Sequence, residues 1–287
     1  MGTLPRPPPR RPDRKPGPPQ RIGFVPAEVD QLLPPLFRLD ANTFDRGFVV
    51  DETMDGVSPV DSGFTSSIRP RRYLLHVPEA VQLMLEDPAN KERVPLVLVF
   101  HGMSRTSWYT ALNETKWIEK ADREGFVVVF PQALGAHDMW GGRTGWVVRG
   151  VGDNIYAREV ISDILHEAGH VIDTNRIYAI GLSNGGMFLT TLLLDPGFRF
   201  AAGCVYMGGY VKGHNPSANR DHTLTPVLLI TGSEDKMLPY SRDAELVFRV
   251  AGHPVEFDEV AGMEHEYRTE HEERIWEFFA KHSLKQE

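Results

Sequence analysis

The chain contains one cysteine, Cys204, among 287 residues, so no disulfide can form within it. It also lacks any apolar run near the roughly 20 residues that a membrane-spanning helix needs, and we expect no membrane span. The formal net charge is −8. Because an acidic protein is poorly suited to bind a polyanion, we expect no nucleic-acid partner. The remaining composition, 41% hydrophobic and 24% charged, is typical of a globular protein.

The N-terminal segment differs in composition from the rest of the chain. Residues 1–21 hold eight prolines and six basic residues against one acidic residue. Proline at this density is incompatible with a helix or a central strand, so we expect a disordered tail. The tail lacks the apolar segment of a secretory signal, and with a single cysteine this indicates a cytoplasmic protein. Residues 22–67 show weak periodicity and form an extension of uncertain structure.

From residue 68 onward, apolar β-branched runs alternate with helical patterns. The runs predict strands at 71–77, 95–100, 126–130, 176–180, 201–207, 226–230 and 254–260. The patterns between them predict helices near 107–124, 155–168, 185–194, 241–250 and 268–282. Such alternation predicts an α/β domain over residues 68–284, with a mostly parallel central sheet covered by helices on both faces.

A candidate nucleophile lies between a predicted strand and a predicted helix. Residues 181–185, Gly-Leu-Ser-Asn-Gly, fit the pattern G-x-S-x-G. In the α/β-hydrolase fold this pattern puts the serine on a sharp strand-to-helix turn, and the flanking glycines leave room for neighbouring backbone. Ser183 is therefore the candidate nucleophile, and a serine that merely caps the helix is the alternative.

The same fold places its acid after the serine and its histidine after the acid. Asp235 follows the predicted strand 226–230, where a carboxylate could hold a histidine in the correct tautomer. Glu234 is adjacent but would point elsewhere, and Asp258 lies inside a predicted strand. We therefore expect Asp235 to be the orienting acid.

His265 lies in the loop between the last predicted strand and the last predicted helix. A histidine in this loop can reach over the end of the sheet toward Ser183. His271 is the main rival, but it is expected inside the helix, and His253 precedes the last strand at the wrong end of the sheet. His265 is therefore the expected general base.

Two backbone N–H groups are candidates for an oxyanion hole, those of Met103 and Asn184. Asn184 follows the nucleophile, and Met103 follows Gly102 in the loop after strand 95–100, as this fold requires. The segment from 208 to 225 is too short for a large cap domain, which leaves the cleft open. The expected substrate-binding residues are His101, Trp140, Trp146 and Tyr240.

A second motif indicates different chemistry. Residues 166–170, His-Glu-Ala-Gly-His, fit the H-E-x-x-H pattern of zinc peptidases, in which two histidines share one helix face. Gly169 predicts the end of the helix before His170, so the two rings would not share a face. A zinc peptidase remains the alternative reaction class, and we expect no metal and no cofactor.

Several of these motifs together resemble one group of proteins. GLSNGGMF at 181–188, the His-Gly at 101–102, TGSEDKMLPY at 231–240 and the Gly-x-x-His at 262–265 resemble the polyhydroxybutyrate depolymerase and feruloyl esterase group of α/β-hydrolases. The resemblance covers roughly residues 68–283. It implies an α/β-hydrolase fold, and hydrolysis of a small-molecule or polymeric ester through Ser183, Asp235 and His265.

Two differences from this group concern the substrate-binding rim. Met103 and Met139 stand where members often have cysteines, and Glu266-Tyr267 stands where they often have Trp-Pro. Other reactions remain open, since a serine peptidase or an acyltransferase would use the same three residues. A binding module would normally have lost one of the three, and none is missing. No feature indicates an oligomeric state.

Overall fold

The structure is a computed structural model that describes residues 43–51, 68–133, 145–146, 148, 152–212 and 224–284. The expected tail, residues 1–21, lies outside the described residues. So does the extension 22–67 apart from 43–51, which forms the first strand. This strand pairs with the next one and so belongs to the sheet of the main domain.

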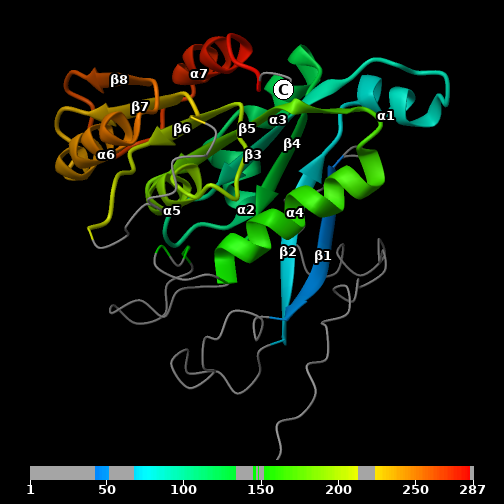
Figure 1. Cartoon of the computed structure of the whole chain (residues 1–287), viewed down its shortest axis with the longest axis horizontal. Coiled ribbons are helices and arrows are strands. Elements are labelled where there is room, and N and C mark those ends of the chain that lie inside the picture. The colour runs from blue at the N-terminus through cyan, green and yellow to red at the C-terminus, as the bar shows by residue number, and fades with distance from the viewer. Residues whose placement is uncertain are drawn as a thin grey trace, which may run out of the picture.

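The described elements follow each other in a strand–helix alternation (Figure 1). In chain order they are β1 (Thr43–Asp51), β2 (Ile68–His76), α1 (Glu79–Glu86), β3 (Val94–Phe100), α2 (Ser107–Tyr109), the π-helix η4 (Thr110–Glu114), α3 (Trp117–Glu124), β4 (Val127–Pro131), α4 (Gly152–Ala168), β5 (Ile172–Leu182), α5 (Asn184–Leu193), β6 (Ala202–Tyr206), β7 (Val227–Gly232), α6 (Leu238–Ala251), β8 (Val255–Val260) and α7 (His271–Ala280).

These strands form one sheet in the order β1-β2-β4-β3-β5-β6-β7-β8. Every neighbouring pair from β4 to β8 is parallel, whereas β2 runs antiparallel to both β1 and β4. The prediction of a mostly parallel α/β-hydrolase sheet is confirmed. Because the parallel strands share one direction, the loops after β3, β5, β7 and β8 meet at one edge of the sheet.

The two faces of the sheet bury two separate cores. In β3, Leu96 and Leu98 pack on one face, while Val97 and Val99 pack on the other. Helices α1, α4, α5 and α6 contribute to the first core, and α3 and α7 to the second. Figure 1 shows α4 crossing the near face. Burial on both faces explains why these strands are continuous apolar runs rather than alternating ones.

The structure differs from the sequence prediction in three places. The expected helix 107–124 is divided into α2, η4 and α3 by an extended residue, Thr115, whose hydroxyl donates to the Thr110 carbonyl. The backbone N–H of Lys116 is then taken by the Glu272 carboxylate instead of by a helical carbonyl. Strand β1 and helix α1 were not predicted, because both are short or weakly patterned.

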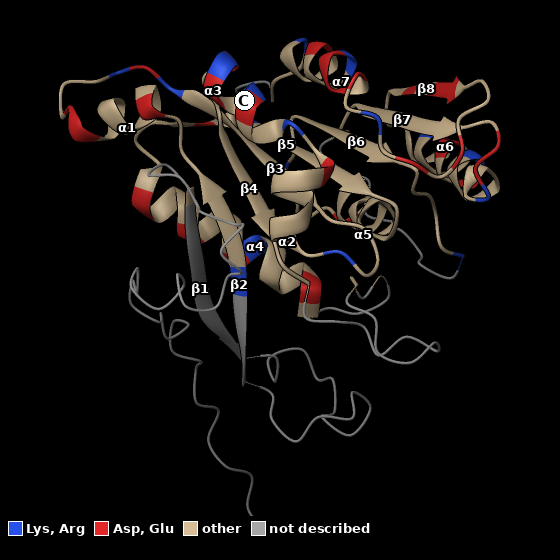
Figure 2. Ribbon diagram, turned by 180° about the vertical axis from the view of Figure 1, so that it is seen from behind, with Lys and Arg blue, Asp and Glu red and all other residues tan. Residues whose placement is uncertain are grey.

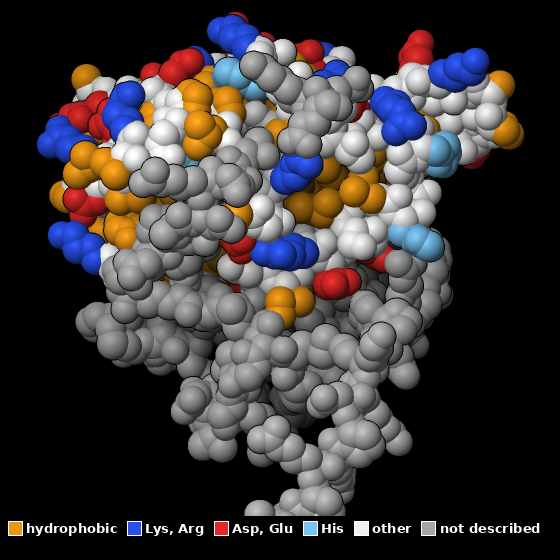
Figure 3. Space-filling model, viewed as in Figure 1, with side chains coloured by type: hydrophobic (Ala, Val, Ile, Leu, Met, Phe, Trp, Pro, Cys, Tyr) orange, Lys and Arg blue, Asp and Glu red, His pale blue; other side chains and the backbone are white. Residues whose placement is uncertain are grey.

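Three inner strands of the sheet, β3, β4 and β6, contain no charged residue. Figure 2 shows β3, β4 and β6 without charge, while Lys, Arg, Asp and Glu occupy the helices, the loops and other strands such as β8. On the face seen in Figure 3 the described basic and acidic side chains are interspersed. Among the described residues, no helix has the length and apolar character to cross a membrane.

Candidate active site

Ser183 occupies a sharp turn between β5 and α5. Its backbone has φ 53° and ψ −112°, a left-handed conformation that is rare for a residue with a side chain. The turn depends on its two glycines. A Cβ on Gly181 would lie 2.3 Å from the Gly185 carbonyl oxygen, and one on Gly185 would lie 2.3 Å from the Phe100 oxygen. The sequence therefore holds Ser183 in a strained backbone that lifts its hydroxyl above the sheet.

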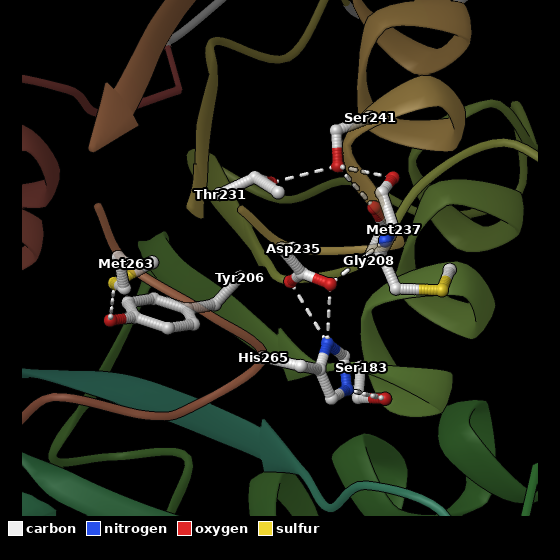
Figure 4. Close-up of polar contacts among 9 residues, drawn as sticks. All are labelled: Ser183, Tyr206, Gly208, Thr231, Asp235, Met237, Ser241, Met263 and His265. Carbon is white, nitrogen blue, oxygen red and sulfur yellow. Dashed lines mark hydrogen bonds and ion pairs between the residues drawn. The ribbon is translucent and has the colours of Figure 1, made fainter. Parts of the chain in front are cut away.

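Three side chains from three loops form one hydrogen-bonded chain (Figure 4). His265 Nε2 lies 2.9 Å from Ser183 Oγ, and His265 Nδ1 lies 2.9 Å from each carboxylate oxygen of Asp235. Ser183 follows β5, Asp235 follows β7 and His265 follows β8. The Asp235 side chain is fully buried, whereas that of His265 is 31% exposed. The structure thus brings together the three residues predicted from the sequence.

The Asp235 carboxylate is oriented by a second donor. Its Oδ1 accepts the backbone N–H of Met237 at 2.8 Å. This contact was not predicted, because a backbone donor two residues away leaves no mark in the side-chain pattern. The competing acids lie elsewhere: Glu234 is exposed, and Asp258 accepts Arg274 at 3.1 Å.

The rival histidines do not reach the serine. His271 is the first residue of α7, and its Nδ1 lies 2.6 Å from the Tyr206 hydroxyl. His253 is buried beside Thr225, at the amino end of β8 and thus at the opposite edge of the sheet from Ser183. Among the described histidines, only His265 contacts the Ser183 hydroxyl.

The loop after β3 lies against the nucleophile turn. A Cβ on Gly102 would be 3.6 Å from Ser183 Cβ, so the two segments lie close together. Asn184 is the first residue of α5, and its backbone N–H has no acceptor within the helix. The structure therefore brings the loop that carries Met103 to the end of α5 that carries Asn184.

Residues 80–224, about half of the chain, match the family Esterase PHB depolymerase. The chain belongs to this family. This PHB depolymerase-type esterase has the α/β-hydrolase fold and is a carboxylic ester hydrolase. Ester hydrolysis by a serine hydrolase is the reaction that the family and its relatives support.

Two relatives of the esterase match it over different lengths. It is 26% identical over 248 residues to an uncharacterized hydrolase of Acanthamoeba polyphaga mimivirus, over 75% of this chain and 77% of that protein. It is 32% identical over 148 residues to a bifunctional acetylxylan esterase/xylanase of Neocallimastix patriciarum, over 52% of this chain. The match spans only 20% of the latter protein.

Solved structures share the fold of the esterase at low sequence identity. An S-formylglutathione hydrolase from Staphylococcus aureus superposes with a TM-score of 0.59 at 15% identity, covering 84% of this chain and 99% of that one. A ferulic acid esterase gives 0.57 at 16% identity, covering 84% and 98%. At these identities the likeness establishes the fold alone.

Two of the expected substrate-binding residues of the esterase are core residues instead. His101 is 0% exposed and Trp146 is 1% exposed, so neither ring is available to a substrate. Trp146 stacks on Phe188 with ring centroids 4.8 Å apart, and its indole N–H donates to the His101 carbonyl at 2.9 Å. The prediction was wrong for both residues. For Trp146 the reason is that an aromatic residue beside a glycine-rich loop does not reveal whether the loop folds inward.

Trp146 has a structural role that the sequence did not indicate. Its backbone N–H donates to the Asn184 side-chain oxygen at 2.6 Å, and its indole holds the carbonyl of His101. It therefore links the turn that carries Ser183 to the loop that carries Met103. Trp140 lies outside the described residues, while Tyr240 is 46% exposed on α6 and stays a prediction.

The His101 ring is held as a neutral imidazole. Its Nε2 accepts the backbone N–H of Ala133 at 3.0 Å, while its Nδ1 lies 2.8 Å from the Gly102 carbonyl and must donate to it. Burial lowers the pKa of His101 from 6.5 to about 4. A proton on Nε2 would face a donor, so the ring supports the loop only in its neutral form.

The stability of the esterase should therefore fall at acid pH. Between pH 6.5 and 4 the unfolded chain binds the His101 proton and the folded chain does not, so the free energy of unfolding decreases as the pH falls through this window. A pKa difference of this size amounts to about 3 kcal/mol. In the wild type, we expect the free energy of unfolding measured in urea to be lower at pH 4.5 than at pH 7 by most of this amount.

The control variants separate this histidine from the others. In His101→Gln the difference in unfolding free energy between the two pH values should shrink by about 2–3 kcal/mol. His170→Gln removes an exposed histidine and should leave the difference unchanged. A pH dependence as steep in His101→Gln as in the wild type would exclude His101 as its source.

The H-E-x-x-H segment of the esterase does not form a shared helix face. Helix α4 ends at Ala168, so His166 is on the helix and His170 is beyond its end, as the glycine at 169 predicted. Both histidines are exposed. Among the described residues, no group of three or more His, Cys, Asp or Glu side chains could hold a metal ion.

Proposed function

We propose that Ser183 is the nucleophile of ester hydrolysis, with His265 as general base and Asp235 as the acid that orients it. The observation that carries the proposal is the hydrogen-bonded chain from Ser183 through His265 to Asp235. A serine hydroxyl is a weak nucleophile until a base takes its proton. With Nδ1–H donated to the carboxylate, the Nε2 lone pair of His265 faces the hydroxyl and can accept that proton.

Acylation begins when Ser183 Oγ attacks the carbonyl carbon of the ester and His265 Nε2 takes the hydroxyl proton. The carbonyl oxygen becomes an oxyanion in the tetrahedral intermediate. The backbone N–H groups of Asn184 and Met103 donate to it, and the amino end of α5 adds a favourable positive potential. When the intermediate collapses, the bond to the alcohol oxygen breaks and His265 gives its proton to that oxygen. The acyl group remains on Ser183.

Deacylation repeats the sequence with water. His265 Nε2 takes a proton from the water, whose oxygen attacks the acyl carbon. The same two N–H groups receive the second oxyanion. Collapse breaks the bond to Ser183 Oγ, which regains its proton from His265, and the carboxylic acid leaves. Asp235 keeps its charge throughout and stabilises the imidazolium in both halves.

Covalent labelling tests this assignment. A fluorophosphonate probe should label the wild type on Ser183, because the probe reacts with serines that a neighbouring base activates. Ser183→Ala should lose the label, whereas Ser162→Ala, which removes an exposed serine from α4, should keep it. A label that persists in Ser183→Ala and maps to another residue would overturn the proposed nucleophile.

The proposed substrates are esters of small acids. Proteins that resemble this chain are named as an acetylxylan esterase/xylanase, a poly(3-hydroxyalkanoate) depolymerase and a feruloyl esterase. The connection between β6 and β7, residues 207–226, is too short for a helical cap that would enclose a long acyl chain. The exposed ring of Tyr240 is the candidate contact for a bulky alcohol or acid group.

We therefore expect p-nitrophenyl butyrate to be cleaved with a higher kcat/KM than p-nitrophenyl palmitate. Without an enclosed acyl pocket, the additional methylenes of palmitate remain in water and contribute no binding energy in the transition state. Both rates are measured in the same detergent, so that micelle formation does not decide the order. Faster cleavage of the palmitate ester would contradict the open site.

A further inference from the structure

Tyr206 lies between the strands that lead to two of the proposed catalytic residues, Ser183 and Asp235. It is the last residue of β6 and pairs with Leu182 on one side and Ile230 on the other. Its carbonyl oxygen accepts the backbone N–H of Ser183 at 2.9 Å. Its side chain is fully buried and points toward the loop that carries His265 (Figure 4).

The Tyr206 hydroxyl has three contacts, all with the segment around His265. It accepts the backbone N–H of Arg268 at 3.2 Å and lies 2.6 Å from His271 Nδ1. The Met263 sulfur, at 3.8 Å, is a weaker contact. Since Arg268 already donates to the phenol oxygen, all groups are satisfied when the phenol donates to His271 Nδ1.

The protonation states of the two rings agree with this direction. Burial raises the pKa of Tyr206, so the phenol keeps its proton. Burial also lowers the pKa of His271, which leaves a nitrogen lone pair free at neutral pH. With the His271 proton on Nε2, the short contact is a hydrogen bond between two neutral groups in which the tyrosine is the donor.

The loop between β8 and α7 is thus held on both sides of His265. Before the histidine, the Met263 carbonyl accepts the Glu234 N–H at 3.1 Å, and the Gly262 N–H donates to Ser233 Oγ at 2.9 Å. These contacts tie the first half of the loop to the segment that carries Asp235. After the histidine, the Tyr206 hydroxyl contacts the Arg268 N–H and His271 Nδ1.

Packing between aromatic rings also holds the half of the loop that follows His265. Tyr267 lies two residues after His265, and its ring centroid is 4.7 Å from that of Tyr206. The Tyr267 hydroxyl accepts the indole N–H of Trp117 at 3.0 Å and donates to the Glu272 carboxylate at 3.0 Å. This packing does not involve the Tyr206 hydroxyl, so a phenylalanine at 206 would retain it.

We propose that the Tyr206 hydroxyl is a positioning group for His265, which holds the second half of the histidine loop while the Tyr206 carbonyl holds Ser183. The proposal rests on the proposed function of Ser183 and His265. Tyr206 would then fix the positions of both residues in the contact between His265 Nε2 and Ser183 Oγ. Loss of the hydroxyl should misplace the base without removing it.

The test is Tyr206→Phe with a matched control. Tyr206→Phe should lower kcat by about tenfold to a hundredfold, since a misplaced catalytic group slows the chemical step. KM should stay within about twofold, because the hydroxyl does not contact the substrate. Tyr178→Phe is the control: Tyr178 is also buried, on neighbouring β5, and its hydroxyl donates to the His282 carbonyl at 2.8 Å, away from the site. It should leave kcat unchanged.

A second pair of variants keeps the test decisive if Tyr206→Phe folds poorly. His271→Asn keeps an acceptor near the position of Nδ1, whereas His271→Leu removes it. The proposal expects His271→Asn to retain more of the wild-type kcat than His271→Leu, with equal KM in both. Thermal unfolding of all four variants separates a loss of stability from a loss of kcat.

Equal kcat in Tyr206→Phe and Tyr178→Phe, or in the two His271 variants, would overturn the positioning role. The proposed function has its own control in the same assay, Ser183→Ala. An inactive Ser183→Ala beside a fully active Tyr206→Phe rejects only the positioning role. An active Ser183→Ala rejects the proposed function as well.

Discussion

Ser183→Ala and His265→Ala should each lower kcat for p-nitrophenyl butyrate by a factor on the order of 10⁴ to 10⁶. The two side chains act as one unit, since the hydroxyl must lose its proton to the imidazole as it attacks. The double variant should therefore be little worse than either single one. Such non-additivity distinguishes a shared step from two independent contributions, because the fold-losses of two independent contributions would multiply in the double variant.

Chelation and variants of the H-E-x-x-H segment distinguish the serine mechanism from zinc chemistry. EDTA should leave the activity unchanged, and His166→Ala should stay close to the wild type, because His170 lies beyond the end of α4. If EDTA abolished activity while Ser183→Ala retained it, the serine mechanism would be wrong. If His265→Ala were active and His271→Ala inactive, the fold would stand but the base would have to be reassigned.

Local sequence patterns were sufficient to predict strands β2 to β8 of the sheet. The runs 95–100 and 126–130 are apolar on both faces because both cores need them, and they became β3 and β4 with nearly the expected bounds. Strand β1 could not be predicted, since it is an edge strand identified by its pairing with β2. The prediction of one helix over 107–124 was also wrong, because Glu272 competes for a helix N–H from far along the chain.

The candidate site could be predicted where its residues lie in short motifs that occur in a fixed order along the chain. Ser183, Asp235 and His265 follow β5, β7 and β8, and their order along the chain is a property of the fold. Nothing local reveals that the side chain of Asn184 binds Trp146, 38 residues earlier in the chain, because that contact depends on how a loop folds back. Contacts such as that of Tyr206 with His271 need the packed structure for the same reason.

Asp235→Asn should lower kcat by a factor on the order of 10³ to 10⁴, although it removes one charge and keeps the shape. The orientation of the new side-chain amide follows from the Met237 N–H, which Asp235 Oδ1 accepts at 2.8 Å in the wild type. In the amide only the oxygen can accept this N–H, so the oxygen must remain on the Met237 side. The NH₂ group then takes the position of Oδ2 beside His265 Nδ1, which the remaining oxygen also faces.

An NH₂ group beside Nδ1 favours the tautomer in which that nitrogen is an acceptor and the imidazole proton lies on Nε2. The nitrogen that faces Ser183 Oγ at 2.9 Å then carries a hydrogen and cannot take the serine proton. The loss should therefore appear in kcat, with KM within about twofold of the wild type. Fluorophosphonate labelling should slow in parallel, since it needs the same proton transfer.

Two neighbouring acids provide the controls for Asp235→Asn. Glu234→Gln removes an exposed charge one residue away, and Asp258→Asn removes the partner of Arg274 on β8. Neither group contacts His265, so both variants should keep kcat within about threefold of the wild type, as surface substitutions usually do. If Asp235→Asn kept a tenth or more of the activity while one of these two variants lost it, the orienting acid would have to be reassigned to that residue.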